Sequence, residues 1–237
     1  MFTLEQYKKK YKESLENPEK FWDEVANKNI LWKKKWDKVL FGDYPNINWF
    51  SGAELNITES CLDGHIKNGN GEKIAYHEVN ENDAARKITY KELLSEVCKL
   101  SNALIDLGIK KSDTVIIYMP TCIEEIVSIL ACARIGAIHS VVFAGLSAKA
   151  LEERILDTKA KIVITADGFE RRGKYYSSIN VVREATRNTK RVSLTIVLKR
   201  FENQKTVLGK NELDYRDLIK NKSSKWPSPQ ISYTNLV

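Results

Sequence analysis

The chain has 237 residues, enough for one large domain or for one domain with an additional N-terminal segment. Apolar residues make up 43% of it and aromatic residues 9%, which is typical of a globular protein with a sizeable core. The net charge of +7 comes mostly from lysine runs such as residues 33–35. Aromatic residues are rarely interleaved with these runs, which argues against a groove for single-stranded nucleic acid. The excess of positive charge suits an anionic ligand, and phosphates are the most common kind.

The sequence shows no targeting or membrane segment. Residues 1–12 are too charged for a signal peptide, and no apolar run approaches the length that crosses a membrane. The four cysteines have no spacing typical of a metal site and are expected to be buried, reduced thiols. We therefore expect a cytoplasmic protein without a membrane or nucleic-acid partner, and the sequence leaves its oligomeric state open.

Residues 1–60 are predicted to form a separate, aromatic-rich helical segment that packs onto the main domain. Asn17 followed by Pro18 is a good helix start, because Asn caps a helix and Pro at its first position loses no hydrogen bond. The segment holds all but one of the five tryptophans and lacks the period-two alternation of strands.

The second predicted domain spans residues 61–237, and from about residue 72 strands alternate with helices. Thr89 and Glu92 form a capping box, apolar residues then recur at helical spacing, and Gly108 ends the helix. The stretch 123–135 is apolar on nearly every face, so that helix should be almost fully buried. Strands are predicted at residues 73–79, 115–119, 137–143, 161–165 and 193–198, and helices at residues 90–107, 123–135, 148–157 and 180–186.

The predicted strands include short, unbroken apolar runs, which indicate a parallel sheet covered by helices on both faces. Because crossovers between parallel strands are right-handed, the economical topology is a doubly wound α/β domain. Residues 223–229 are expected to form a loop.

Ligands of such sheets bind beyond the carboxyl ends of the strands, where two loops lie. In the first loop, Phe143, Ala144 and Gly145 precede Ser147, which begins a helix whose N-terminus favours anions. The small residues would let a ligand approach the backbone. The alternative is an ordinary strand-to-helix turn with a serine cap.

The second loop holds three cations within four residues, Arg171, Arg172 and Lys174, with Gly173 relaxing the backbone between them. Such groups can clamp a phosphate, and the alternative is an exposed polar loop. No stretch of the chain matches the Gly-x4-Gly-Lys-Ser/Thr pattern of a Walker loop. His139 lies in an apolar strand, which indicates a hydrogen-bonded core histidine, and the residues by themselves indicate no catalytic centre.

Several stretches are similar to the AMP-forming acetyl-CoA synthetases. Asn-Pro-Glu-Lys-Phe-Trp at residues 17–22 and Trp-Phe-Ser-Gly at residues 49–52 resemble the N-terminal segment of that family. The longest match runs from residues 117–120 through 130–143, and residues 164–168 followed by 171–174 complete it. The resemblance covers nearly the whole chain and weakens after about residue 190.

The resemblance implies a two-step ligase of the adenylate-forming superfamily. Acetate and ATP form acetyl-adenylate and diphosphate, and the thiol of coenzyme A then displaces AMP. For the full-length enzyme it implies ATP, coenzyme A and Mg²⁺, and acetate as the further small-molecule substrate. The family loop that matches residues 171–174 contacts the 3′-phosphoadenosine end of coenzyme A, and the loop that matches residues 143–145 lies along the pantetheine tunnel.

The chain also departs from the family pattern. The family usually has Asp-Arg-His where this chain has Asp-Gly-His at residues 63–65, and Gly-Gly-Phe where it has Ala-Gly-Leu at residues 144–146. The family continues from Tyr-Thr into a glycine-rich loop that holds the ATP phosphates, whereas three residues follow Tyr233 and Thr234 here. We therefore expect the chain by itself to be inactive. Because the acyl-pocket residues of the family lie downstream, a propionyl- or other short-chain acyl-CoA ligase fragment stays an alternative. A second alternative is a catalytically inactive relic or binding module.

Overall fold

The computed structural model describes residues 2–81, 84–187, 189 and 191–225, and the chain forms two compact units that divide between Gly64 and His65. The domain boundary predicted after residue 60 stays a prediction. The loop predicted at residues 223–229 lies partly, and Tyr233 and Thr234 lie wholly, outside the described residues.

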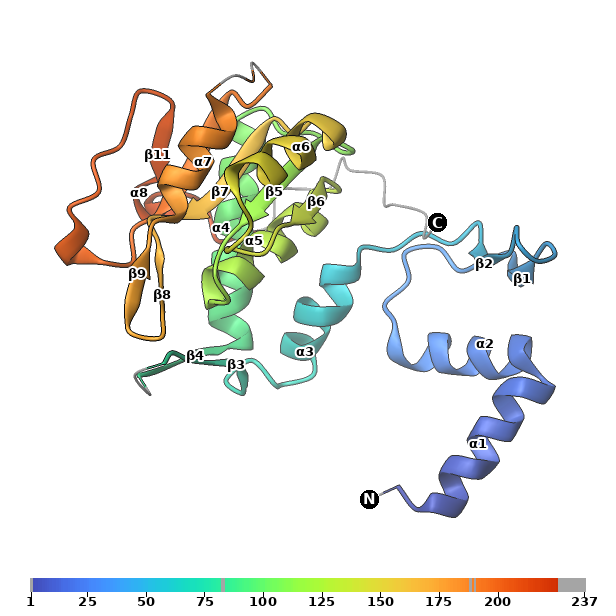
Figure 1. Ribbon diagram of the computed structural model, residues 1–237. Helices are drawn as coiled ribbons and strands as arrows, with labels where there is room; N and C mark the ends of the chain where they lie inside the picture. The colour runs from blue at the N-terminus through green and yellow to red at the C-terminus, as the bar shows by residue number, and fades with distance from the viewer. Residues whose placement is uncertain (1, 82–83, 188, 190, 226–237) are drawn as a thin grey trace. The chain divides into compact units, whose positions relative to one another are not determined.

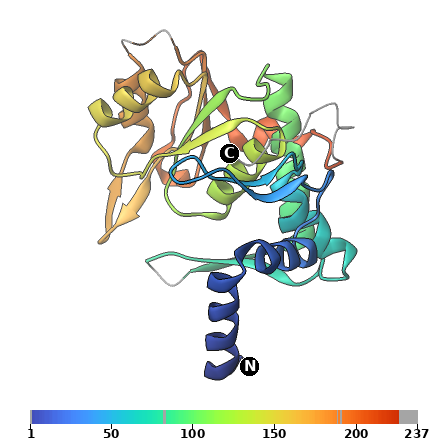
Figure 2. The ribbon, with the colours of Figure 1, turned by 90° about the vertical axis from the view of Figure 1, so that its right-hand side faces the viewer.

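The first unit contains two helices and a hairpin. α1 (Leu4–Glu16) begins at a capping box of Thr3 and Gln6. α2 (Pro18–Asn29) begins at the predicted Asn17–Pro18 step, but the Asn17 side chain does not make the predicted capping hydrogen bond. The two helices run in different directions (Figures 1 and 2). β1 (Lys38–Phe41) pairs antiparallel with β2 (Asn48–Ser51), and a π-helical turn (Glu59–Asp63) closes the unit. The hairpin was not predicted, because four-residue strands are too short to show an alternating pattern.

Aromatic rings account for the packing of the first unit. Trp32 lies edge-on to Trp36 with ring centroids 4.9 Å apart, and Phe50 contacts both rings at 5.4 and 5.0 Å. The indole N–H of Trp32 donates to the Ala26 carbonyl at 3.0 Å, which ties this cluster to α2. The tryptophan-rich composition of residues 1–60 thus serves packing.

The second unit is built on a five-stranded parallel sheet in the order β11–β10–β7–β5–β6. The chain enters at β5, adds β6 on one side, and then adds the other strands in sequence on the other side. β5 and β7 are buried at every position. The strands are β5 (Thr114–Tyr118), β6 (Ile138–Val141), β7 (Ile162–Ala166), β10 (Leu194–Leu198) and β11 (Glu212–Asp214).

Helices cover both faces of this sheet (Figure 1). α6 and α7 pack on one face, where Ile116, Leu151, Ile155 and Val163 are fully buried in one cluster. α4 packs against α5 and α8 on the other face, and no residue of α5 is exposed, although only six of its 12 residues are buried, fewer than predicted. The doubly wound α/β prediction is therefore confirmed. The helices are α4 (Tyr90–Asp106), α5 (Ile123–Arg134), α6 (Ala148–Thr158), α7 (Ser178–Thr186) and α8 (Tyr215–Lys220).

Smaller elements complete the second unit. β3 (Ile74–Val79) pairs antiparallel with β4 (Ala85–Thr89), and β8 (Phe169–Arg171) pairs antiparallel with β9 (Lys174–Tyr176). α3 (Gly64–Lys67) and a 3₁₀ turn (Glu202–Gln204) are short connections. In the described ranges, no helix has both the length and the apolar character that a membrane span requires.

Two sequence predictions need correction. Three of the four cysteines are buried, but Cys61 is exposed, and all four are free thiols. His139 is half-buried in β6, an edge strand of the sheet, and not in the core, and this partial burial lowers its pKa.

Candidate functional site

The cationic segment predicted as a loop is a β-hairpin, β8–β9, that projects from the sheet in both views of the ribbon (Figures 1 and 2). Arg172 and Gly173 form its two-residue turn with φ angles of 53° and 69°. Positive φ at both central residues is the geometry of a type I′ turn, which explains the glycine. Asp167 and Gly168, before β8, are buried, whereas residues 170–174 are exposed, so the alternative of an exposed polar loop does not describe the base of this segment.

A buried carboxylate anchors the base of the hairpin. Asp167, at the end of β7, accepts the backbone N–H groups of Arg200 at 3.0 Å and Phe201 at 3.1 Å, and that of Gly168 at 2.8 Å. The hydroxyl of Tyr175 on β9 donates to the Asp167 carbonyl at 3.0 Å. The segments that follow β7 and β10 are therefore held together at the carboxyl ends of these strands.

Two cations face one another across the hairpin. Arg171 is the direct cross-strand partner of Lys174, which places both side chains on the same face. Like charges in such a pair are destabilising unless an anion lies between them. Among the residues that the structure describes, none forms an ion pair with Arg171, Arg172 or Lys174.

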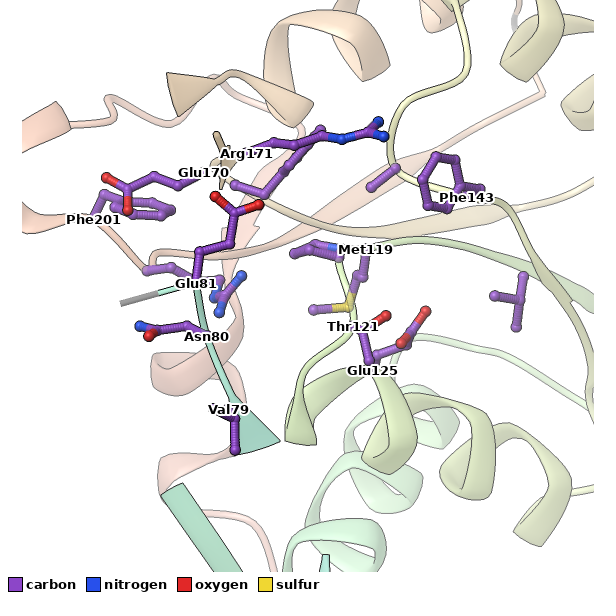
Figure 3. A pocket seen from close by; sticks show the side chains of 15 residues that line it. Val79, Asn80, Glu81, Met119, Thr121, Glu125, Phe143, Glu170, Arg171 and Phe201 are labelled. Atoms are coloured by element: carbon purple, nitrogen blue, oxygen red, sulfur yellow. The ribbon is translucent and has the colours of Figure 1, made fainter. Parts of the chain in front are cut away.

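A cavity of about 750 Å³ lies beside this hairpin (Figure 3). It is lined by residues 119–121 after β5, Phe143 and Ala144 after β6, residues 169–171, and Arg200 and Phe201 after β10. These segments all follow the carboxyl ends of parallel strands. β6 and β7 lie on opposite sides of β5, so the strand order reverses there. The cavity lies at this switch point, where open α/β sheets bind ligands.

The structure brings part of the predicted site together. Phe143, Ala144 and Arg171 line this one cavity, and Figure 3 shows Arg171 pointing toward the side of Phe143. Arg172, Gly173 and Lys174 lie at the tip of the hairpin, and neither these three residues nor Gly145 lines the cavity. The sequence reasoning missed Arg200, although it follows a predicted strand and the same carboxyl-end rule points to it.

Ion pairs partly neutralise the cavity wall. Glu78, at the end of β3, accepts an Arg200 guanidinium N–H at 3.2 Å and the backbone N–H of Ile123 at 3.0 Å, and it also binds Arg86. Arg86 continues to Glu124 with contacts of 2.9 and 2.7 Å. This contact lowers the pKa of Glu124 although burial, the larger single influence, opposes the shift. Arg200 thus has a carboxylate partner, whereas Arg171 forms no ion pair with any of the described residues.

Apolar and acidic groups complete the cavity. Phe143 is 67% exposed and so presents an apolar side chain to solvent, and Ala144 beside it is buried and small. Burial raises the pKa of Glu125 on the floor of the cavity. In the described part of the chain, no cluster of three or more His, Cys, Asp or Glu side chains is placed to hold a metal ion. The arrangement can hold a phosphate at the hairpin and an extended, weakly polar chain along Phe143 and Ala144.

Two family models match the chain. The model of AMP-binding enzymes matches residues 65–234, and the model of the acetyl-coenzyme A synthetase N-terminus matches residues 7–61. Among curated proteins, an acetyl-coenzyme A synthetase of Gamma-proteobacterium EBAC31A08 is 41% identical over 97% of this chain and 36% of its own length. Another, from Phycomyces blakesleeanus, is 46% identical over 83% of this chain and 30% of its own length. The chain thus spans about a third of the length of these relatives.

A solved structure has the same fold. Acetoacetyl-CoA synthetase from Streptomyces lividans superposes with a TM-score of 0.81 at 23% identity, over 95% of this chain and 33% of that one. At this level of identity the similarity concerns the fold.

Proposed function

This chain belongs to the family of AMP-binding enzymes, and we propose that it is part of an acetate–CoA ligase and contributes the coenzyme A-binding loop. The complete enzyme would join acetate to coenzyme A through acetyl-adenylate, with ATP converted to AMP and diphosphate. The relatives named acetyl-coenzyme A synthetase support acetate as the substrate. ATP and Mg²⁺ belong to the complete enzyme in this proposal.

The observation that carries the proposal is the pair of cations on the hairpin. Arg171 and Lys174 lie opposite one another, and the structure assigns them no carboxylate partner within the described residues. A phosphomonoester dianion would relieve their repulsion and accept charge-assisted hydrogen bonds from both. We assign the 3′-phosphate of coenzyme A to this position, with Arg172 and Gly173 shaping the turn.

The cavity supports the rest of the assignment. Phe143 and Ala144 line the same cavity as Arg171, which points toward the side of Phe143 (Figure 3), so a ligand held at the hairpin can extend past them. Pantetheine is an extended chain of methylene and amide groups, which suits an apolar ring beside a small residue. A Cβ atom on Gly145 would approach the Phe143 ring to 2.7 Å, so a side chain at this position would require the ring to shift.

Binding to the 237-residue chain tests this function. Replacing Arg171 by Ala should weaken coenzyme A binding about tenfold, because a charge-assisted hydrogen bond contributes about 1.5 kcal/mol at a partly exposed site. Titration calorimetry with coenzyme A and with dephospho-coenzyme A measures the effect. Dephospho-coenzyme A, which lacks the 3′-phosphate, should bind the wild type and the variant alike.

Arg154→Ala is the matched control, because it removes an exposed arginine of α6 that lies outside the cavity lining. It should leave both affinities unchanged. If Arg171→Ala weakens the two ligands equally, or weakens neither, the hairpin does not bind the 3′-phosphate.

A further inference from the structure

The turn of the β8–β9 hairpin already binds an anion from this chain. The Glu81 carboxylate accepts the backbone N–H of Arg172 at 2.5 Å. Glu81 follows β3, lies 91 residues away along the chain, and lines the cavity. Figure 3 shows its side chain reaching toward the hairpin.

The backbone geometry explains why this N–H group is available. In the hairpin, Arg171 and Lys174 are the last cross-strand pair, so the turn residue Arg172 has no partner strand opposite it. Arg172 and Gly173 are consecutive residues with positive φ, and the Arg172 N–H, which has no partner across the hairpin, is free to bind an acceptor from elsewhere in the chain. With cations on both flanks of the turn, this is an anion position, because a carboxylate or a phosphate oxygen fits the same donor.

We propose that Glu81 is an internal competitor that sets the affinity of the hairpin for the 3′-phosphate of coenzyme A. This inference rests on the proposed function. A phosphate that reaches Arg171 and Lys174 meets the Glu81 negative charge at the turn between them, so it must displace the carboxylate or bind beside it. The carboxylate therefore weakens phosphate binding. It also opposes the binding of anions whose affinity for the hairpin is too low to displace it.

The variants Glu81→Gln and Glu81→Ala distinguish two roles of Glu81: competition with the phosphate, and stabilisation of the turn. Glutamine keeps an acceptor for the Arg172 N–H but loses the charge, and alanine loses both. Both variants should bind coenzyme A about two- to fivefold more tightly than the wild type, the range expected for an exposed pair of charges. Dephospho-coenzyme A should bind all three proteins equally, and the gain should shrink at high salt.

Glu170→Gln is the matched control, because Glu170 lines the same cavity but does not bind the turn N–H. If it strengthens coenzyme A binding as much as Glu81→Gln does, general cavity charge is responsible and the inference is wrong. A Glu81→Ala variant that binds coenzyme A more weakly would show that Glu81 supports the turn, which also overturns it. Should Glu81→Ala fail to fold, the isosteric Glu81→Gln decides.

The proposed function and this inference fail in different ways. A wild type that binds coenzyme A and dephospho-coenzyme A equally refutes the phosphate assignment and the competition with it. A wild type that prefers coenzyme A, together with Glu81 variants that show no gain, refutes the competition alone.

Discussion

Asp167 is the residue on which the geometry of the cavity depends most. Its carboxylate is fully buried and accepts three backbone N–H groups from two segments far apart in the sequence. Asparagine has nearly the same shape, but its amide N–H₂ group would replace one carboxylate oxygen that accepts a backbone hydrogen bond. One buried backbone donor would then face another donor and stay unsatisfied.

We expect Asp167→Asn to lower the free energy of unfolding by about 2–3 kcal/mol, the cost of an unsatisfied buried donor that had bound a charged acceptor. Urea denaturation measures it. The control is Asp157→Asn, at an exposed position of α6, which should change stability by less than about 0.5 kcal/mol. Equal stability of the Asp167 variant and the wild type would show that the backbone donors find other partners.

At the scale of elements, a bidentate ion pair holds α7 against β11. The Arg183 guanidinium donates to both carboxylate oxygens of Glu212 at 2.8 and 2.7 Å, and Gly209 donates its N–H to the same carboxylate at 2.7 Å. The Arg183 hydrogen bond lowers the pKa of Glu212, against burial, with help from the Gly209 N–H. Because the folded-state pKa is the lower one, the pair stabilises the fold above the unfolded pKa of about 4.3, and this contribution is lost as the pH falls through the folded value.

Glu212→Gln should therefore lower the free energy of unfolding by about 1 kcal/mol near pH 7, a modest value because Arg183 is partly exposed. At a pH below the lowered pKa of Glu212, the wild type carries a protonated carboxyl and the difference should vanish. Denaturant unfolding at both pH values measures this. Glu184→Gln, exposed on the same helix, is the control. A difference that stays constant with pH would mean that packing, and not charge, connects the two elements.

The elements that the sequence predicted well are those with strong local signals. β5, α5 and β7 follow from apolar runs of the right length, and the Thr89–Glu92 capping box begins α4 where it was predicted. The strand predicted over residues 137–143 is shorter, because pairing with β5 ends at Val141.

The elements that were missed depend on contacts between distant residues. β8 and β9 have three residues each, so no periodicity can reveal them, and β11 with α8 follows a long irregular segment. The residues of the candidate site show the same difference between local sequence signals and contacts between distant residues. Arg171 and Phe143 were found because each follows a recognisable strand, whereas Glu81 reaches the site only through the fold of the β3–β4 hairpin.

At the scale of the whole molecule, the strand order determines where the ligand can bind. In the described sheet the strand order reverses at β5, which has β6 on one side and β7 on the other. The cavity and the cationic hairpin lie at this switch point. The chain spans about a third of its relatives, so the site is proposed as one part of a larger active centre.

The most direct test of this account is a crystal structure of the chain with coenzyme A bound. We predict that the 3′-phosphate lies between the side chains of Arg171 and Lys174, with the pantetheine chain running past Phe143 and Ala144. Coenzyme A bound with its 3′-phosphate away from the β8–β9 hairpin, or bound outside the cavity at the carboxyl ends of the strands, would contradict the account.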